Sequence, residues 1–215
     1  MKIGVFDSGV GGLSMANAIK KAFPQYEVIA REDRENLPYG TKTPEQLVNL
    51  VTPILEQMVE YGCDVIVIAC NTVTTNIIGR LREAVSVPLV GLEPMVKPAA
   101  NITKSKSIAV FATPATLASE RYKYLKQNYC KNIAIFEPDC SDWASMIEGD
   151  RLQINKITKN VSDALQKQAD VIVLGCTHYH WIEELISNIA GKKARVLQPE
   201  QAVVSRLRSV IEQLD

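Results

Sequence analysis

Several features that would assign this sequence to a common class of protein are missing from it. Its 24 Lys and Arg residues balance its 24 Asp and Glu residues, so no excess charge attracts nucleic acid or an anionic membrane. No apolar stretch is long enough for a signal peptide or a membrane span, and residues 2–6 read directly as a strand. We therefore expect a cytoplasmic protein that binds a small molecule and has neither nucleic acid nor membrane as a partner.

The cysteines also lack the spacing of a structural framework. Five are present, an odd number, and no two of them form a CxxC pair. This argues against a disulfide framework and a structural zinc site, and we expect reduced thiols. A zinc site built on Cys176 and His178 would need two more ligands, and only His180 and distant cysteines could supply them. We expect no metal.

The glycine-rich segment near the amino terminus does not have a nucleotide-binding pattern. Asp7-Ser8-Gly9-Val10-Gly11-Gly12 has neither the G-x-G-x-x-G spacing of a dinucleotide fold nor the Lys-Ser/Thr ending of a P-loop. An amino-acid ligand suits it better, because the Asp7 carboxylate can meet an α-ammonium and the Ser8 hydroxyl can meet a carboxylate.

What the sequence has is an alternation of short apolar runs with amphipathic segments. This is the βαβ pattern of a parallel sheet covered on both faces, and the 47% hydrophobic content is ample for its core. A helix over 44–61 is introduced by Thr43-Pro44. The predicted strands cover residues 2–7, 27–31, 64–70, 87–91, 107–112, 132–136, 170–175 and 194–197.

The pattern repeats roughly 105 residues further along the chain. Residues 64–72 match 170–178, and residues 3–8 match 108–113. The repeat predicts two similar parallel-sheet α/β domains related by a pseudo-twofold, with the active site in the cleft between them. We place one domain at 1–94 plus 199–215 and the other at 95–198.

The carboxyl-terminal segment is assigned to the first domain because it reads as an amphipathic helix over about 199–214. Its apolar residues recur at helical spacing, so we expect the helix to cross back and pack on that domain. These residues are Ala202, Val203, Leu207, Val210 and Leu214.

Each repeat sets a cysteine at the end of a buried strand, Cys70 in one and Cys176 in the other. A lone cysteine there is usually packing, but two at matching positions, each followed by polar residues, favour chemistry. The start of a following helix is expected to lower each thiol pKa well below about 8.5. His178 reads alternatively as a neutral structural histidine, and a Cys-His hydrolase would leave Cys70 unexplained.

Two further loops hold polar groups at strand ends. Pro38-Tyr39-Gly40 reads either as a substrate loop or as a simple Pro-Gly turn. Thr113 and Thr116 stand where Asp7-Ser8 stands in the other repeat, and their hydroxyls suit a carboxylate or the cap of the next helix equally well.

Short strings in one order along nearly the whole chain carry a family resemblance. They are Asp7-Ser8-Gly9, Pro38-Tyr39-Gly40, Cys70-Asn71-Thr72, Thr113 with Thr116, Glu148 and Gly175-Cys176-Thr177-His178-Tyr179. The ordered set resembles the glutamate racemase family of the aspartate/glutamate racemase superfamily. The resemblance implies two α/β domains facing across a cleft and a cofactor-independent isomerase that makes D-glutamate for peptidoglycan, without pyridoxal phosphate or metal. A homodimer is left open.

By the same resemblance, Cys70 and Cys176 exchange roles as acid and base on the two faces of the substrate. Asp7 and His178 would assist the two thiols, and Glu148 would be a secondary acid. The residues implied to hold the substrate are Ser8, Pro38, Tyr39, Gly40, Asn71, Thr72, Thr113, Thr116 and Thr177.

The chain departs from the family pattern in places. Glu32-Asp33 and Asn36 replace the usual Gly-Asp and Arg ahead of Pro-Tyr-Gly, and His180-Trp181 replaces the usual Pro-Leu. Three alternatives stay open: an aspartate racemase or related isomerase, an amino-acid-binding protein without turnover, and a cysteine hydrolase. His178 favours glutamate over aspartate, because aspartate-type members tend to have Glu at that position.

Overall fold

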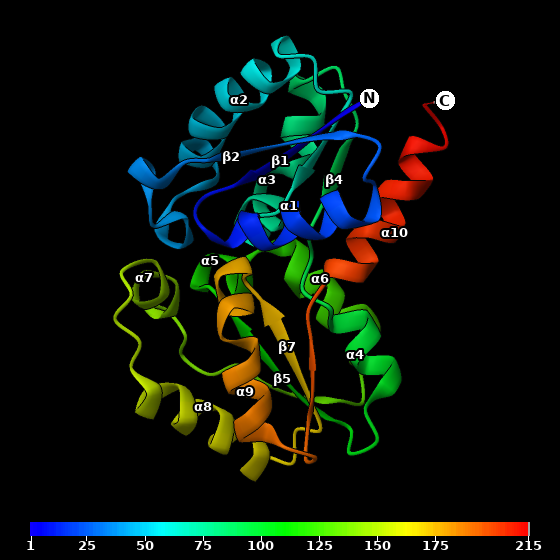
Figure 1. The fold of residues 1–215 in the computed structure, drawn as a ribbon. Helices are drawn as coiled ribbons and strands as arrows, with labels where there is room; N and C mark the ends of the chain where they lie inside the picture. Colours follow the sequence, from blue (N-terminus) through cyan, green and yellow to red (C-terminus); the bar gives the residue numbers. More distant parts are fainter. Residues whose placement is uncertain (215) are drawn as a thin grey trace. The chain divides into compact units, whose positions relative to one another are not determined.

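The computed structural model describes residues 1–214, which form two compact units. Unit 1 comprises Met1–Glu93 and the residues from Pro199 onward, and unit 2 comprises Pro94–Gln198. Each unit contains one parallel four-stranded sheet with helices packed against it (Figure 1). The predicted α/β class and the repeat of two similar parallel sheets are confirmed.

The sheet of unit 1 has the strand order β2-β1-β3-β4. Side chains that alternate along its strands point to opposite faces of the sheet and belong to two apolar clusters. Ile3 and Val5 pack with Met15 and Leu207 in one cluster, and Phe6 packs in the other. The strands are β1 (Lys2–Asp7), β2 (Glu27–Glu32), β3 (Val65–Ile68) and β4 (Leu89–Gly91).

The second α-helix of unit 1 begins where the sequence signals predict. Thr43 and Gln46 form a reciprocal capping box at the start of the second helix, and Pro44 occupies its first turn. Gly62, which follows this helix, has a φ of +93°, a conformation that favours glycine. The elements are α1 (Gly11–Ala22), η1 (Arg34–Asn36), η2 (Tyr39–Thr41), α2 (Pro44–Glu60), α3 (Asn71–Ala84) and α10 (Glu200–Ile211).

The sheet of unit 2 has the equivalent order β6-β5-β7-β8. Trp143 lies at the centre of its larger apolar cluster, with ring centroids 5.3 Å from Phe111 and 5.2 Å from Tyr179. Both contacts have edge-to-face geometry. The strands are β5 (Ser107–Ala112), β6 (Ala134–Phe136), β7 (Val171–Gly175) and β8 (Arg195–Leu197).

Most of the α-helices described in unit 2 are shorter than those of unit 1, and they are more numerous. Two of them, α5 and α6, are each capped at the start by a hydroxyl, from Thr113 and Ser119 respectively. The elements are α4 (Val96–Ile102), α5 (Pro114–Ala118), α6 (Glu120–Tyr129), α7 (Trp143–Glu148), α8 (Ile154–Gln166), η3 (Thr177–Ile182) and α9 (Glu183–Ala190).

The last helix differs from its prediction at both ends of its apolar face. Helix α10 packs on α1 and β4 through Val203, Leu207 and Val210. Ala202 is exposed because it lies one residue, or about 100°, away from this face. Leu214 is also exposed because the helix ends at Ile211, three residues earlier.

Most strands are shorter than predicted, since the residues nearest the strand ends turn into loops. The strand predicted over 64–70 covers only Val65–Ile68, so Cys70 lies beyond it. No helix within residues 1–214 has the length and apolarity needed to cross a bilayer.

Candidate active site

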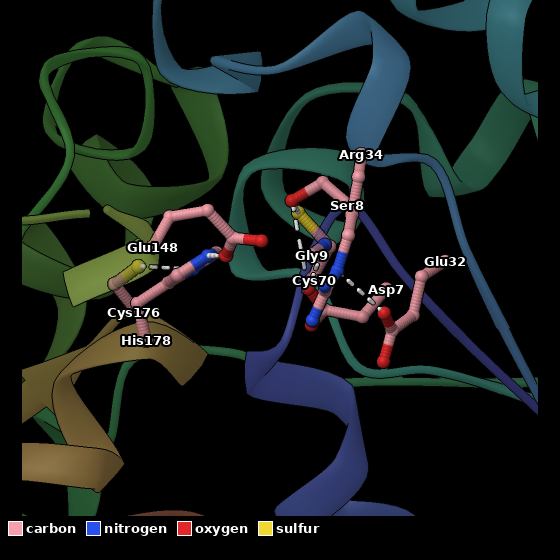
Figure 2. A network of polar contacts seen from close by, with 9 residues as sticks. All are labelled: Asp7, Ser8, Gly9, Glu32, Arg34, Cys70, Glu148, Cys176 and His178. Atoms are coloured by element: carbon pink, nitrogen blue, oxygen red, sulfur yellow. Dashed lines mark hydrogen bonds and ion pairs between the residues drawn. The ribbon is translucent and has the colours of Figure 1, made fainter. Parts of the chain in front are cut away.

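One candidate group of site residues lies at the carboxyl ends of two adjacent strands in unit 1. Phe6 of β1 pairs in register with Ile68 of β3, so the chain leaves the sheet side by side at Ser8 and Cys70. Ser8 Oγ is 3.6 Å from Cys70 Sγ, and both side chains are buried. The Asp7 carboxylate, also buried, accepts a 2.9 Å hydrogen bond from the Gly9 N–H (Figure 2).

Gly12 is required by the close approach of helix α1 to Asp7. A Cβ atom at Gly12 would lie 2.5 Å from the Asp7 Cβ, well inside van der Waals contact. The glycine therefore lets the first turn of α1 cover the Asp7 side chain and hold it against the loop.

The expected low pKa of Cys70 is wrong for this structure. Cys70 does cap helix α3, and the nearby N–H groups of Val73 and Thr72 and the Ser8 hydroxyl each lower its pKa. Burial of the thiol and the adjacent Asp7 carboxylate have the opposite effect and are larger, and they raise the pKa to about 12. Cys70 is therefore a protonated thiol at neutral pH when no ligand is present.

Asn71 has the strongest unmet hydrogen-bonding capacity in the unit 1 group. Both its amide nitrogen and its carbonyl oxygen are buried, and neither has a partner among residues 1–214. An unsatisfied buried polar group costs about 1–3 kcal/mol, so such a group points to a ligand that completes it. Thr72 next to it is buried as well.

A pinned loop follows β2 and contains the Pro-Tyr-Gly string. Tyr39 is buried and its hydroxyl donates a 2.5 Å hydrogen bond to Asp33, which also accepts a 2.9 Å bond from Asn36. Burial and the Asp33 carboxylate raise the pKa of Tyr39 above its usual value. The Tyr39 side chain thus fixes the loop, whose Pro38 is exposed and whose Gly40 is partly exposed.

Unit 2 contains a second candidate group, a chain of polar side chains. Cys176 follows β7 and caps η3, and its Sγ lies 3.9 Å from His178 Nδ1. His178 Nε2 is 2.8 Å from Glu148 Oε2, at the end of α7 (Figure 2). A Cβ atom at Gly175 would lie 2.9 Å from the Ala112 Cβ, so this glycine permits the tight β5–β7 approach beside Cys176.

The candidate threonines of unit 2, Thr113, Thr116 and Thr177, are buried at the end of β5 and after β7. Thr113 accepts a 3.3 Å hydrogen bond from the Thr116 N–H and donates a 3.0 Å bond to the Thr116 hydroxyl. The helix cap that the sequence allowed is therefore formed. Thr177 is buried next to Cys176.

His180, which a zinc site would have required, does not join such a site. Burial and the nearby His178 lower its pKa to about 4, so it is neutral at physiological pH. Within the described residues no group of three or more His, Cys, Asp or Glu side chains could hold a metal ion. The five cysteines are all unbridged.

An ion pair beside Asp7 was not predicted from the sequence. Glu32 is the register partner of Asp7 in the sheet, and Arg34 Nε lies 2.9 Å from Glu32 Oε2. The strand register would have indicated the position of Glu32, but the direction of the Arg34 side chain depends on the fold of η1.

Three comparisons with known proteins agree on the family. The family described as Asp/Glu/Hydantoin racemase matches residues 3–207. The chain is 36% identical to a glutamate racemase from Herpetosiphon aurantiacus over 99% of its own length and 85% of the relative. It is 34% identical to a glutamate racemase from Methylococcus capsulatus over 98% of its own length and 79% of that relative.

Solved structures give the same result. The chain matches Escherichia coli glutamate racemase, solved with L-glutamate and an activator, with a TM-score of 0.91, 28% identity, and 98% and 82% of the two chains covered. It matches the Francisella tularensis enzyme, solved with D-glutamate, with a TM-score of 0.82, 27% identity, and 99% and 81% covered. This chain therefore belongs to the Asp/Glu/Hydantoin racemase family of enzymes.

Proposed function

We propose that this protein interconverts L- and D-glutamate, with the thiols of Cys70 and Cys176 as the acid and the base. The observation that carries the proposal is that the same strand end in each unit bears a buried cysteine with its own polar partners. The identity to glutamate racemases over nearly the whole chain supports glutamate as the substrate.

In the proposed reaction a proton leaves one face of the α-carbon and another arrives on the opposite face. With D-glutamate, the Cys70 thiolate forms an S–H bond with the α-proton, and the electron pair of the broken C–H bond stays on the substrate as a carbanion. The Cys176 thiol then gives its proton to this carbanion and becomes a thiolate. With L-glutamate the roles reverse, and each turnover leaves the thiols ready for the opposite enantiomer.

Cys70 must lose its proton to act as a base, and its surroundings bear on that step. With a pKa of about 12 the thiol is rarely ionised at neutral pH, although the thiolate that does form is a strong base toward the weakly acidic α-proton. The thiolate is stabilised by the Ser8 hydroxyl and by the N–H groups at the start of α3. On the other side, the Glu148–His178 pair lies next to Cys176 and would assist its proton transfers.

The substrate would be held by neutral polar groups at the ends of the strands. The unpartnered amide of Asn71 can both donate to a carboxylate and accept from an ammonium. Preorganised hydroxyl and N–H dipoles would also stabilise the carbanion as its charge develops. The proposed contacts are Ser8, Pro38, Tyr39, Gly40, Asn71 and Thr72 in unit 1, and Thr113, Thr116 and Thr177 in unit 2.

The product D-glutamate would supply peptidoglycan synthesis in the cytoplasm. No cofactor is needed in this scheme, because the two thiols perform both proton transfers.

The experiment that tests the proposed function uses the purified protein with L-glutamate in D2O and no added cofactor. Circular dichroism follows the loss of chirality, and NMR follows the Cα proton, with L-aspartate run in parallel. We expect racemisation of glutamate with deuterium entering the product. Activity on aspartate alone would overturn the substrate assignment, and exchange with neither amino acid would contradict a racemase of this type.

A further inference from the structure

Negative charge gathers at one end of the unit 1 sheet, close to Cys70. Asp7 and Glu32 are register partners on β1 and β2, and the Asp33 N–H donates to the Asp7 carbonyl oxygen at 3.3 Å. The Glu32 side chain is mostly buried, and its Oε1 has no hydrogen-bond partner among residues 1–214. The Asp7 carboxylate therefore lies beside the thiol that is proposed to become an anion, and Glu32 is its neighbour on the adjacent strand.

Arg34 brings positive charge to this group of acids. Its Nε lies 2.9 Å from Glu32 Oε2, and Figure 2 shows the side chain extending from η1 toward the segment that holds Asp7 and Ser8. The Arg34 side chain keeps 52% of its surface exposed. A solute that reaches the ends of the strands can therefore meet the guanidinium.

The loop that carries Arg34 is fixed on both sides. Asp33 binds Asn36 and Tyr39 through its two carboxylate oxygens, and the Leu37 N–H donates to the Arg34 carbonyl at 3.3 Å. Glu32 anchors the guanidinium itself. This arrangement restricts the position of the charge before any ligand arrives, which reduces the entropy lost on binding.

The charge balance of the proposed reaction calls for such a cation. Glutamate carries two carboxylates and one ammonium, so it enters with a net charge of −1 and meets Asp7 and, when it is D-glutamate, the Cys70 thiolate as well. Like charges held close together near a protein surface repel each other. A guanidinium offsets this repulsion, and its planar fork matches a carboxylate.

We propose that Arg34, held by Glu32, is a specificity-determining residue that binds a carboxylate of the acidic substrate at the strand ends of unit 1. The inference rests on the proposed function and adds to it the residue that selects for negative charge. Arg34 acts on substrate binding and takes no part in proton transfer. Its loss is therefore expected to raise KM and to leave kcat nearly unchanged.

The test compares Arg34→Gln and Arg34→Lys with a matched control, Arg80→Gln. Arg80 resembles Arg34 in that its side chain is 51% exposed and forms an ion pair with a glutamate, Glu45, at 3.5 Å. It lies on α3 in the same unit. Steady-state racemisation of L-glutamate is measured at low salt and at high salt for the wild type and the three variants.

We expect Arg34→Gln to raise KM for glutamate about tenfold or more while kcat changes less than threefold. Arg34→Lys should recover part of the loss, because it restores the charge without the fork. Added salt should raise KM in the wild type more than in Arg34→Gln. Arg80→Gln should behave as the wild type.

Other outcomes separate the two proposals. An unchanged KM in a folded Arg34→Gln, or an equal change in Arg80→Gln, would overturn the role of Arg34 and leave the proposed function intact. A fall in kcat alone would also overturn it. A wild type that does not act on glutamate would overturn the proposed function and this inference with it.

Discussion

Ser8 Oγ lies 3.6 Å from Cys70 Sγ and so joins the loops that follow β1 and β3. The hydroxyl can donate to a thiolate and accept from a thiol, so it can stabilise both states of Cys70. This contact counters part of the pKa increase caused by burial and by Asp7. The chemistry proposed for Cys70 thus depends on how closely the two strand ends approach.

Replacing either proposed acid-base cysteine should nearly abolish racemisation. We expect Cys70→Ser and Cys176→Ser each to reduce kcat by about 10²–10⁴-fold, the usual contribution of a positioned acid or base. Each variant should still exchange the Cα proton of the one enantiomer that its remaining thiol deprotonates, as NMR in D2O would detect. Cys130→Ser is the control, because Cys130 is as buried as Cys176, with 7% of its surface exposed. Full activity in Cys70→Ser or Cys176→Ser would contradict the two-thiol scheme.

Neutralising Glu148 should slow the chemistry and leave the fold intact. Glu148→Gln keeps the size of the side chain but removes the charge 2.8 Å from His178 Nε2. We expect kcat/KM to fall about tenfold, equally in both directions because the two enantiomers of glutamate have the same free energy. Coupled assays of each direction measure this. Glu120→Gln, which breaks an exposed ion pair with Lys123 in the same unit, should have no effect.

The stability of the protein should decrease at alkaline pH because of its buried thiols. Burial raises the pKa of Cys140 to about 12, whereas an unfolded chain loses this proton near pH 8.5. The unfolded state therefore binds fewer protons between these values, and the free energy of unfolding falls as pH rises through them.

Cys140→Ala isolates this effect. It should reduce the slope of unfolding free energy against pH by up to about 1.4 kcal/mol per pH unit, measured by urea unfolding at several pH values between 8 and 10.5. The slope is the readout, since a cavity at this site lowers stability by a similar amount at every pH. An unchanged slope would show that Cys140 does not hold its proton through this range.

Alanine should have different effects at two glycines in helices of unit 1, lowering activity at Gly12 and raising stability at Gly79. Gly12→Ala places a methyl group 2.5 Å from the Asp7 Cβ and should displace Asp7, lowering kcat about tenfold or more. Gly79→Ala meets nothing within 4 Å in α3 and should raise the free energy of unfolding by about 0.4–1 kcal/mol. Activity assays and thermal unfolding compare them. Equal effects of the two changes on activity would contradict a special role for the Asp7 contact.

Much of the architecture could be predicted from local pattern. The β-branched runs indicated all eight strands, and Thr43-Pro44 indicated the start of α2, because these signals act over a few residues. The same pattern placed Cys176 directly after β7, but it extended β3 to Cys70, two residues beyond the observed end at Ile68.

The features that the sequence did not predict depend on packing between residues far apart in the chain. The pKa of Cys70 is set by its complete burial beside Asp7, which a local helix-cap argument does not contain. The ion pair of Glu32 and Arg34 likewise depends on the side-chain direction in η1. The roles given to the site residues remain predictions.

Helix α10 has a consequence for how the protein is made. Its Leu207 and Val210 belong to the same apolar cluster as Ile3 and Met15, although almost the whole of the chain separates them. The ribosome therefore synthesises all of unit 2 before it synthesises α10, the last helix that packs against the unit 1 core. Until α10 is synthesised, the apolar residues that it covers on the α1 side of the first sheet stay exposed. A chaperone can bind the nascent chain there, or a protease can cleave it, during this interval.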